Sequence, residues 1–547
     1  MKDLKTCLKG LWRMSGASRG LILLTVLTGV VRICASLTFV WVCKRLVDIA
    51  TGLNDASLAG AIGILAAALL TQIACGIAYS YIMKLNVVKS QNRLRRSFFS
   101  HVLNSRWNGR EEFRTGDTIN RLEEDIRVLS ELICESVPGA MVTVLQLLAA
   151  SCYLLFLEPS LLWLVLVMMF VMVGCSKLYF RKIRSLTSQI RAEDSNVQQL
   201  IQENLQNRVL VLTLFGVGNV LSRLSGIQDR LEKKTVERLD CNAVARGFMN
   251  LGFTGGYAIA FLWGVLGILH GTVTFGMMTS FLQLVGQVQR PVADLSVYVP
   301  AFIKSITSVE RLLELEDLEV EVAKGDFLVE DAPGIRFENV TFAYSGLNVL
   351  EGFSHDFKPG SLTVLAGPTG VGKSTLTRLS LGLLRPSAGS VCVYSRTGES
   401  HAADVDTRCN FMYVPQGDSL MSGTIRENML LANPDATQAE IEDALRTSAA
   451  EFVFSLENGL DSLCGERGSG LSQGQIQRIS VARALLHKGG VLILDEATSA
   501  LDLETEERLL DSLKARCKGE KTIIFISHRP AASRIADEIV TLQPLGC

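Results

Sequence analysis

The fold of the second half of the chain is decided by the stretch Gly367-Pro368-Thr369-Gly370-Val371-Gly372-Lys373-Ser374-Thr375. Residues 361–366 before it predict a β-strand and residues 374–383 after it predict a helix, which is the context that a phosphate-binding loop requires. The glycines let backbone N–H groups curl around an anion at the helix N-terminus. Lys373 supplies a positive charge for the outer phosphates and Ser374 a hydroxyl for Mg²⁺. All nine residues are therefore candidate nucleotide contacts.

A pair of carboxylates further along the chain fits the same chemistry. The apolar run 491–494 predicts a buried strand, and Asp495 and Glu496 follow it directly. One carboxylate can hold Mg²⁺ through water while the other polarises an attacking water, as phosphoryl transfer requires. A capped strand end is the structural alternative, and the phosphate-binding loop upstream argues against it. We therefore expect Asp495 to be a Mg²⁺ ligand together with Ser374, and Glu496 to be catalytic.

Composition excludes some classes of protein and favours others. The net charge is −1 and no Lys/Arg block stands out, so no nucleic-acid partner is expected. Thirteen cysteines are scattered singly, which indicates neither a zinc site nor a disulfide framework. A hydrophobic fraction of 48%, with a mean hydropathy of +0.29, is high for a soluble protein of this size and indicates a lipid bilayer. At 547 residues the chain is also too long for one hydrophobic core.

Hydropathy before residue 305 predicts six membrane-spanning helices, each about the twenty residues that the hydrocarbon core requires. They lie near 20–42, 58–83, 136–157, 160–180, 246–269 and 274–300. The short connections between them lack Lys and Arg, whereas 84–114 and 177–191 are rich in both, which places the long connections and both termini in the cytoplasm. Lys44 and Arg45, at the outer end of the first span, are the exception. We expect a multi-pass protein of the bacterial cytoplasmic membrane, without a cleaved signal peptide.

The chain is expected to be multidomain, with an all-α transmembrane domain at 1–317, a linker at 318–334 and an α/β P-loop domain at 335–547. In the last part, short β-branched or apolar runs alternate with helical stretches, which is typical of a largely parallel sheet. The predicted strands are 335–342, 361–366, 390–394, 411–414, 490–494, 521–526 and 537–542.

With these motifs in place, the chain resembles the ATP-binding-cassette (ABC) transporters in their exporter-type half-transporter form. The most discriminating match is Leu471-Ser472-Gln473-Gly474-Gln475, which is similar to the signature sequence of that family, with Gln473 where many members have glycine. Tyr344 matches the aromatic residue that stacks on adenine, and Gln416 the glutamine that meets Mg²⁺. Asp502 matches the loop that follows the second carboxylate motif, and His528 the histidine that contacts the γ-phosphate. The membrane half is similar through Ser308-Val309-Glu310-Arg311-Leu312.

The resemblance implies an ATP-hydrolysing exporter of a lipid, drug or peptide, with ATP and Mg²⁺ as cofactors. It also implies a second half-transporter chain, identical or different, whose signature completes the site from the other side. Short coupling helices near 112–121 and 208–216 would transmit closure to the membrane. An ATP-gated channel or regulatory membrane subunit is the alternative, and the presence of both Glu496 and His528 favours hydrolysis.

Two features of the predicted spans concern helix packing and substrate contact. Gly252, Gly256, Ala260 and Gly264 repeat every four residues, which predicts close helix packing more readily than a substrate path. Arg32 lies midway along the first span, where a charge is costly and usually faces a cavity or a partner. It is therefore a candidate for substrate contact, with a structural ion pair as the alternative.

Overall fold

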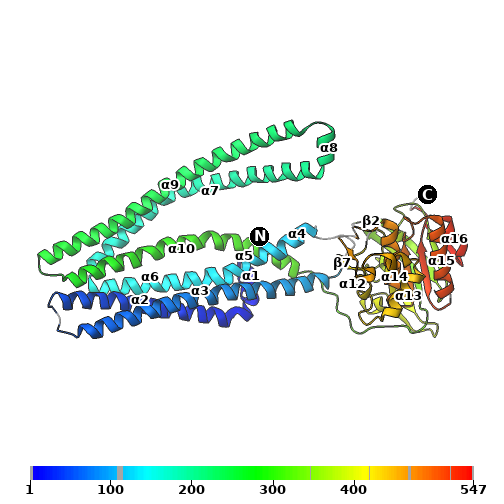
Figure 1. Cartoon of the computed structure of the whole chain (residues 1–547), viewed down its shortest axis with the longest axis horizontal. Helices are drawn as coiled ribbons and strands as arrows, with labels where there is room; N and C mark the ends of the chain where they lie inside the picture. The colour runs from blue at the N-terminus through cyan, green and yellow to red at the C-terminus, as the bar shows by residue number, and fades with distance from the viewer. Residues whose placement is uncertain are drawn as a thin grey trace. The chain divides into compact units, whose positions relative to one another are not determined.

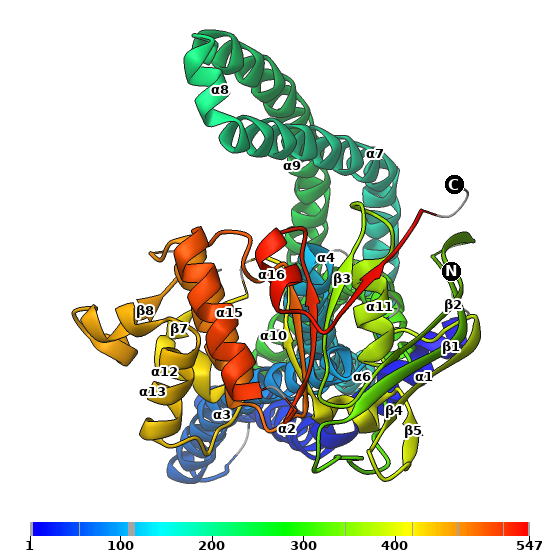
Figure 2. The same cartoon turned by 90° about the vertical axis from the view of Figure 1, so that its right-hand side faces the viewer.

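The computed structural model describes residues 4–53, 55–107, 115–344, 346–417, 419–465, 468, 470–517 and 519–544 (Figures 1 and 2). It divides into two compact units. The first consists of residues 1–99 and 119–316, and the second of residues 100–118 and 317–547. Segment 100–118 thus belongs to the same unit as the nucleotide-binding half, although it precedes that half by more than 200 residues.

The first unit is entirely helical among its described residues. Its long helices are α2 (Arg19–Ala50), α3 (Leu58–Leu103), α6 (Val137–Leu157), α7 (Pro159–Gln206), α9 (Val217–Leu269) and α10 (Phe275–Glu316). Its short helices are α1 (Leu4–Met14), α5 (Ile126–Glu131) and α8 (Arg208–Thr213), with a 3₁₀ turn at Gly16–Ser18 and π turns at Arg121–Asp125 and Leu132–Ser136. The short helix α4 (Thr115–Asn120) crosses the boundary between the two units, which falls after residue 118.

Five of the described helices are long and apolar enough to cross a membrane, at Arg19–Ala50, Leu58–Leu103, Gly116–Leu157, Val217–Leu269 and Phe275–Glu316. The predicted span at 160–180 falls in α7, where the side chains of 168–173 and 175–181 lie outside the described part, so it stays a prediction. Helices α7 and α9 run side by side as a hairpin whose far end, with α8 at the tip, diverges from α2, α3, α6 and α10 (Figures 1 and 2).

The small-residue face on α9 is a packing surface. Gly252, Gly256, Ala260 and Gly264 are its buried members. A Cβ built on Gly256 would lie 2.0 Å from Gln289 Nε2, and one on Gly264 2.5 Å from Met278 Cγ, both on α10. The predicted packing role is therefore confirmed, because a larger side chain at Gly264 would meet the base of the Met278 side chain and one at Gly256 would displace the end of the Gln289 side chain.

The second unit contains two main sheets. The antiparallel sheet has the order β2 (Leu347–Phe357), β1 (Gly334–Tyr344), β4 (Ala388–Tyr394) and β5 (Ser400–Ala402). The parallel sheet has the order β11 (Glu538–Thr541), β3 (Leu362–Ala366), β10 (Thr522–Ile526), β9 (Val491–Asp495) and β6 (Phe411–Val414). A small third pairing joins β7 (Gly423–Thr424) to β8 (Leu463–Cys464).

The expectation of a largely parallel sheet is right for the five strands that carry the phosphate-binding loop and wrong for β1 and β4. These two pair antiparallel with each other, and β1 also pairs with β2, a strand that the sequence analysis did not predict. For the β1–β2 pair the reason is geometric. Only 345–346 separate β1 from β2, and so short a connection permits a hairpin but no crossover.

Alternate side chains of the parallel strands feed two cores. Ile493, Ile524 and Ile526 face helix α11 (Lys373–Ser380) and the antiparallel sheet. Their neighbours Leu492, Leu494 and Phe525 point the other way. That second core holds α14 (Gln473–Leu486), α15 (Leu503–Cys517) and α16 (Pro530–Ile535), and a third core joins α12 (Ile425–Leu430) and α13 (Gln438–Thr447) to α14. The sheet is covered on both faces, as parallel sheets require, so its carboxyl edge is where polar groups gather.

Candidate nucleotide site

The phosphate-binding loop links β3 to α11 and has the backbone that its glycines permit. Gly367, Gly370 and Gly372 have φ of 143°, 86° and 104°, in the region that L side chains rarely adopt. A Cβ on Gly367 would also lie 2.6 Å from the carbonyl oxygen of Leu542. Helix α11 starts at Lys373, so the loop presents its backbone N–H groups at a helix N-terminus.

Lys373 is folded back over this loop. Its Nζ donates to the carbonyl oxygens of Gly367 at 2.5 Å and Pro368 at 3.0 Å, and lies 2.9 Å from His528 Nε2. Burial lowers the pKa of the Lys373 ammonium, an effect that the carboxylates of Glu496 and Asp495 oppose. An anion bound next to this ammonium would stabilise its charged form.

Asp495 ends the fully buried strand β9 and faces the loop. Its Oδ2 accepts a hydrogen bond from Ser374 Oγ at 3.3 Å. Burial raises the pKa of the Asp495 carboxyl, while the Ser374 hydrogen bond opposes that shift. A hydroxyl and a carboxylate at this spacing are the oxygen donors that Mg²⁺ prefers.

Glu496 has a strained backbone, with φ of 50° in the left-handed region. Its backbone N–H donates to the carbonyl of Ile526, which holds it at the edge of the sheet. Gln416 Nε2 donates to its Oε2 at 2.6 Å, and His528 Nε2 lies 3.9 Å from its Oε1. The structure therefore brings Lys373, Gln416, Glu496 and His528 together, with Glu496 in a backbone conformation that glutamate rarely adopts.

The signature residues occupy another place in the unit. Ser472 is the N-cap of α14 and forms a capping box with Gln475, and Ser472 itself is exposed. Gln477 on this helix bonds to Ser499 Oγ and to the N–H of Ala500. Asp502 caps α15 by accepting from the N–H of Thr505, a bond that lowers the pKa of its carboxyl. The N-terminus of α14 is thus exposed at Ser472 and Gln473, at the end of a helix that favours negative charge.

Tyr344, the predicted base-stacking residue, ends β1 and is half-buried. Its ring meets Phe342 edge-on at 4.8 Å between centroids, and its hydroxyl accepts from Arg378 Nη1 at 3.3 Å. Arg378 lies on α11, so the tyrosine is tied to the helix that carries Lys373. Arg378 could not be predicted from the sequence, because a lone arginine in a helix belongs to no motif.

In the membrane unit, Arg32 is half-buried on α2, with its guanidinium 5.0 Å from the centroid of the Tyr79 ring. No carboxylate of the described residues lies within ion-pair distance of it. The predicted alternative, a structural ion pair, finds no partner in that part of the chain. One turn further along α2, Ser36 Oγ accepts from Gln287 Nε2 of α10 at 3.0 Å, so the polar surface continues there.

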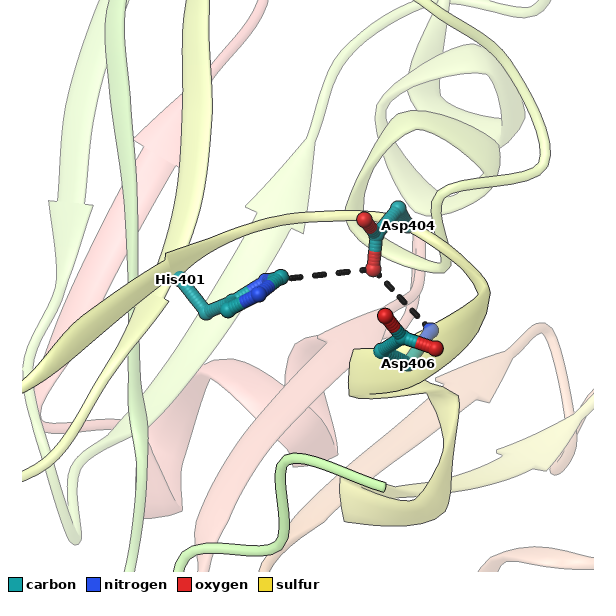
Figure 3. Close-up of side chains that lie close together, drawn as sticks. All are labelled: His401, Asp404 and Asp406. Carbon is teal, nitrogen blue, oxygen red and sulfur yellow. Dashed lines mark hydrogen bonds and ion pairs between the residues drawn. The ribbon is translucent and has the colours of Figure 1, made fainter. Parts of the chain in front are cut away.

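A His/Asp cluster outside the nucleotide site is explained by local structure (Figure 3). His401, Asp404 and Asp406 offer ligand atoms within 4.8 Å of one another. Asp404, however, caps the 3₁₀ turn Val405–Asn410, and Asp406 accepts the backbone N–H of Lys324 at 2.8 Å. Both carboxylates are therefore already engaged in folding.

The fold and the site together define the class of this protein: it is a P-loop ATPase that spans a membrane. The family model described as ABC transporter transmembrane region matches residues 22–292, and the model described as ABC transporter matches residues 350–499. The chain belongs to the ABC transporter family. It has the exporter half-transporter architecture, in which a multi-pass membrane domain is fused to one ATP-binding, transport-ATPase domain.

Several relatives support this assignment. The chain is 30% identical to the mouse mitochondrial ATP-binding cassette sub-family B member 10, covering 86% of this chain and 67% of that one. It is also 30% identical to the ABC multidrug transporter mdr2 of Aspergillus fumigatus, over 79% of this chain but only 55% of the relative. An ATP-dependent lipid A-core flippase of Vibrio parahaemolyticus is 28% identical, over 82% and 78%.

A solved structure shares the fold. A bacterial Atm1-family ABC exporter with ATP bound superposes with a TM-score of 0.78 at 24% identity, over 96% of this chain and 93% of that one. The likeness extends through both units of the chain.

Proposed function

We propose that this chain is half of an ATP-hydrolysing exporter that moves a hydrophobic or amphipathic substrate, a lipid, drug or peptide, out of the cytoplasm or inner leaflet by alternating access. The observation that carries the proposal is the joint position of Glu496, Gln416, His528 and Lys373 at the carboxyl edge of the parallel sheet. A site that only bound nucleotide would not need the glutamate and the histidine 3.9 Å apart beside a phosphate-binding lysine.

In this proposal Tyr344 stacks on adenine while the backbone of 367–375 and Lys373 hold the phosphates. Glu496 accepts the proton of the attacking water, and His528 contacts the γ-phosphate. Mg²⁺ would be held by Ser374, Gln416 and Asp495, where it would neutralise charge on the phosphates. The spacing of Ser374 and Asp495 supports this ligand set.

The proposed partner is a second half-transporter chain, the same or different. The signature, Leu471 to Gln475, would act on the nucleotide of that partner, and the exposure of the α14 N-terminus supports this role. The tip of the α7–α9 hairpin offers further support, since Leu210, Leu212, Leu214 and Phe215 are exposed there, Phe215 by 93%. So large an apolar tip suits a partner surface. The predicted coupling segment at 208–216 coincides with it, whereas the one at 112–121 lies partly outside the described residues.

We further propose a membrane domain at 1–317, apart from the segment 100–118 that folds with the second unit, and a nucleotide-binding domain at 335–547. We also propose a bacterial cytoplasmic membrane and cytoplasmic termini. The basic residues that flank the predicted spans support this orientation.

Reconstitution in sealed vesicles tests transport against gating. We expect ATP added on the nucleotide-domain side to drive concentrative movement of a fluorescent phospholipid or amphipathic peptide, and Glu496→Gln to abolish it. A channel or regulatory subunit would instead give ATP-dependent flux that only dissipates a gradient and that survives Glu496→Gln. Survival of flux in that variant would contradict the exporter proposal.

Arg32 is the proposed substrate contact, because its charge lies in a predicted span without a carboxylate partner among the described residues. We expect Arg32→Gln to lower substrate-stimulated ATP hydrolysis by about ten- to a hundredfold while basal hydrolysis stays within about twofold, since losing a charge-assisted contact costs about 1.5–3 kcal/mol. The matched control is Arg45→Gln, because Arg45 lies on the same helix, 5.3 Å from the Trp41 ring centroid. Equal losses in both variants would contradict a specific role.

A further inference from the structure

The segment after α3 is built into the nucleotide-binding unit. Ser105 forms an antiparallel bridge with Val320. Arg106 N–H donates to the carbonyl of Glu319 at 2.7 Å, and Glu321 N–H donates to that of Asn104 at 2.9 Å. These two hydrogen bonds, which make up the bridge, hold the chain just before Trp107, which packs on the core that contains the antiparallel sheet.

Trp107 reaches the proposed base-binding residue through one side chain. The guanidinium of Arg378 lies over the Trp107 ring, 4.7 Å from its centroid, and Arg378 Nη1 donates to Tyr344 OH at 3.3 Å. No carboxylate of the described residues lies within ion-pair distance of Arg378, so this cation is held between two aromatic side chains. All three residues belong to the same compact unit.

The arrangement restricts Tyr344. Phe342 meets its ring edge-on, and Arg378 fixes its hydroxyl. Without Trp107, the long Arg378 side chain would regain rotamer freedom and the hydroxyl would lose its fixed donor. A tyrosine that must order itself when the base arrives binds that base more weakly than one already in place.

We propose that Trp107 is a positioning residue for the base of ATP, acting through Arg378 on Tyr344. The proposal rests on the nucleotide-binding function proposed above. It assigns part of the base-binding site to a residue more than 200 positions before the phosphate-binding loop. The phosphates are bound by other groups, so Trp107 should affect affinity for the base and leave the chemical step intact.

The first test is a split between KM and kcat in the full-length protein. Trp107→Ala is expected to raise the KM for ATP, and the Kd of a fluorescent ATP analogue, by about three- to tenfold, with kcat within about twofold. Trp107→Phe keeps an aromatic face and should recover most of the affinity. The matched control is Trp12→Ala, which removes another stack of this kind in the other unit. There the guanidinium of Arg19 lies over the Trp12 ring, 4.0 Å from its centroid.

The second test separates base from phosphate. Inorganic tripolyphosphate, which has no base, should compete for the site with the same inhibition constant in the wild type and in Trp107→Ala. The effect of Trp107→Ala on ATP affinity should also shrink in a Tyr344→Phe background, because the hydroxyl that Arg378 holds is gone. Equal weakening of ATP and tripolyphosphate, an unchanged ATP affinity, or additive effects of the two substitutions would overturn the proposal. Wild-type protein that binds no ATP would instead overturn the proposed function.

Discussion

Glu496→Gln is expected to lower ATP hydrolysis by about 10²- to 10⁴-fold, the range that general-base catalysis typically supplies, while ATP binding stays within about twofold of wild type. The amide has the shape of the carboxylate but cannot accept a proton from the attacking water. It can still accept the hydrogen bond from Gln416, so the surrounding geometry should survive. Phosphate release and equilibrium binding of labelled ATP, measured on the same preparation, check both halves of this expectation.

The matched control is Glu504→Gln, because Glu504 is an exposed acidic residue in the first turn of α15, only eight positions further along the same chain. It should leave hydrolysis within about twofold, as expected for an exposed side chain without a catalytic contact. Hydrolysis in Glu496→Gln within a few-fold of wild type would show that another group activates the water, and loss of ATP binding would mean that the residue is structural.

The second large effect concerns sites shared between chains. Lys373→Met removes the phosphate-binding charge, and we expect it to abolish nucleotide trapping in a dimer of identical chains. Ser472→Asp keeps an N-cap for α14 but places a carboxylate where the partner's phosphates would lie, so it should also abolish trapping. A dimer that pairs one Lys373→Met chain with one Ser472→Asp chain should retain one intact site and trap about half of the wild-type nucleotide.

The control dimer carries the same two substitutions in one chain, paired with a wild-type chain. If each site combines the loop of one chain with the signature of the other, this dimer has no intact site and traps nothing. Vanadate-dependent trapping of labelled nucleotide in tandem-tagged mixed dimers measures both arrangements. Trapping in the control dimer alone would place both halves of the site in one chain and contradict the proposed partner.

Much of the nucleotide site can be anticipated from the sequence because its geometry is local. The loop between β3 and α11 and the two carboxylates at the end of β9 are each fixed by a strand end and by neighbours within a few residues. Parallel strands present their carboxyl ends at one edge, so these motifs had to meet. The glycine face on α9 was also readable, since its four-residue repeat is itself the packing surface.

Other features depend on contacts between distant parts of the chain, which produce no periodic pattern in the sequence. In β2, buried and exposed positions do not alternate regularly, so its sequence shows no strand pattern that would distinguish it from a loop. Its pairing with β1 is what makes it a strand. Trp107 follows a polar stretch, and its importance comes only from Arg378, far along the chain. The strained φ of Glu496 is likewise imposed by the surrounding fold, because glutamate has no preference for that region.

The length of α9 has a mechanical consequence. Its 53 residues form one continuous helix of about 80 Å, of which a bilayer covers only about 30 Å. If the helix tilts by about 5° around the part within the bilayer, the remaining length of about 50 Å carries its other end through roughly 4 Å, about three quarters of the rise of one helical turn. If α9 crosses the bilayer in this way, it would act as a lever that magnifies a small rotation within the bilayer into a displacement as large as a side chain at the α8 end.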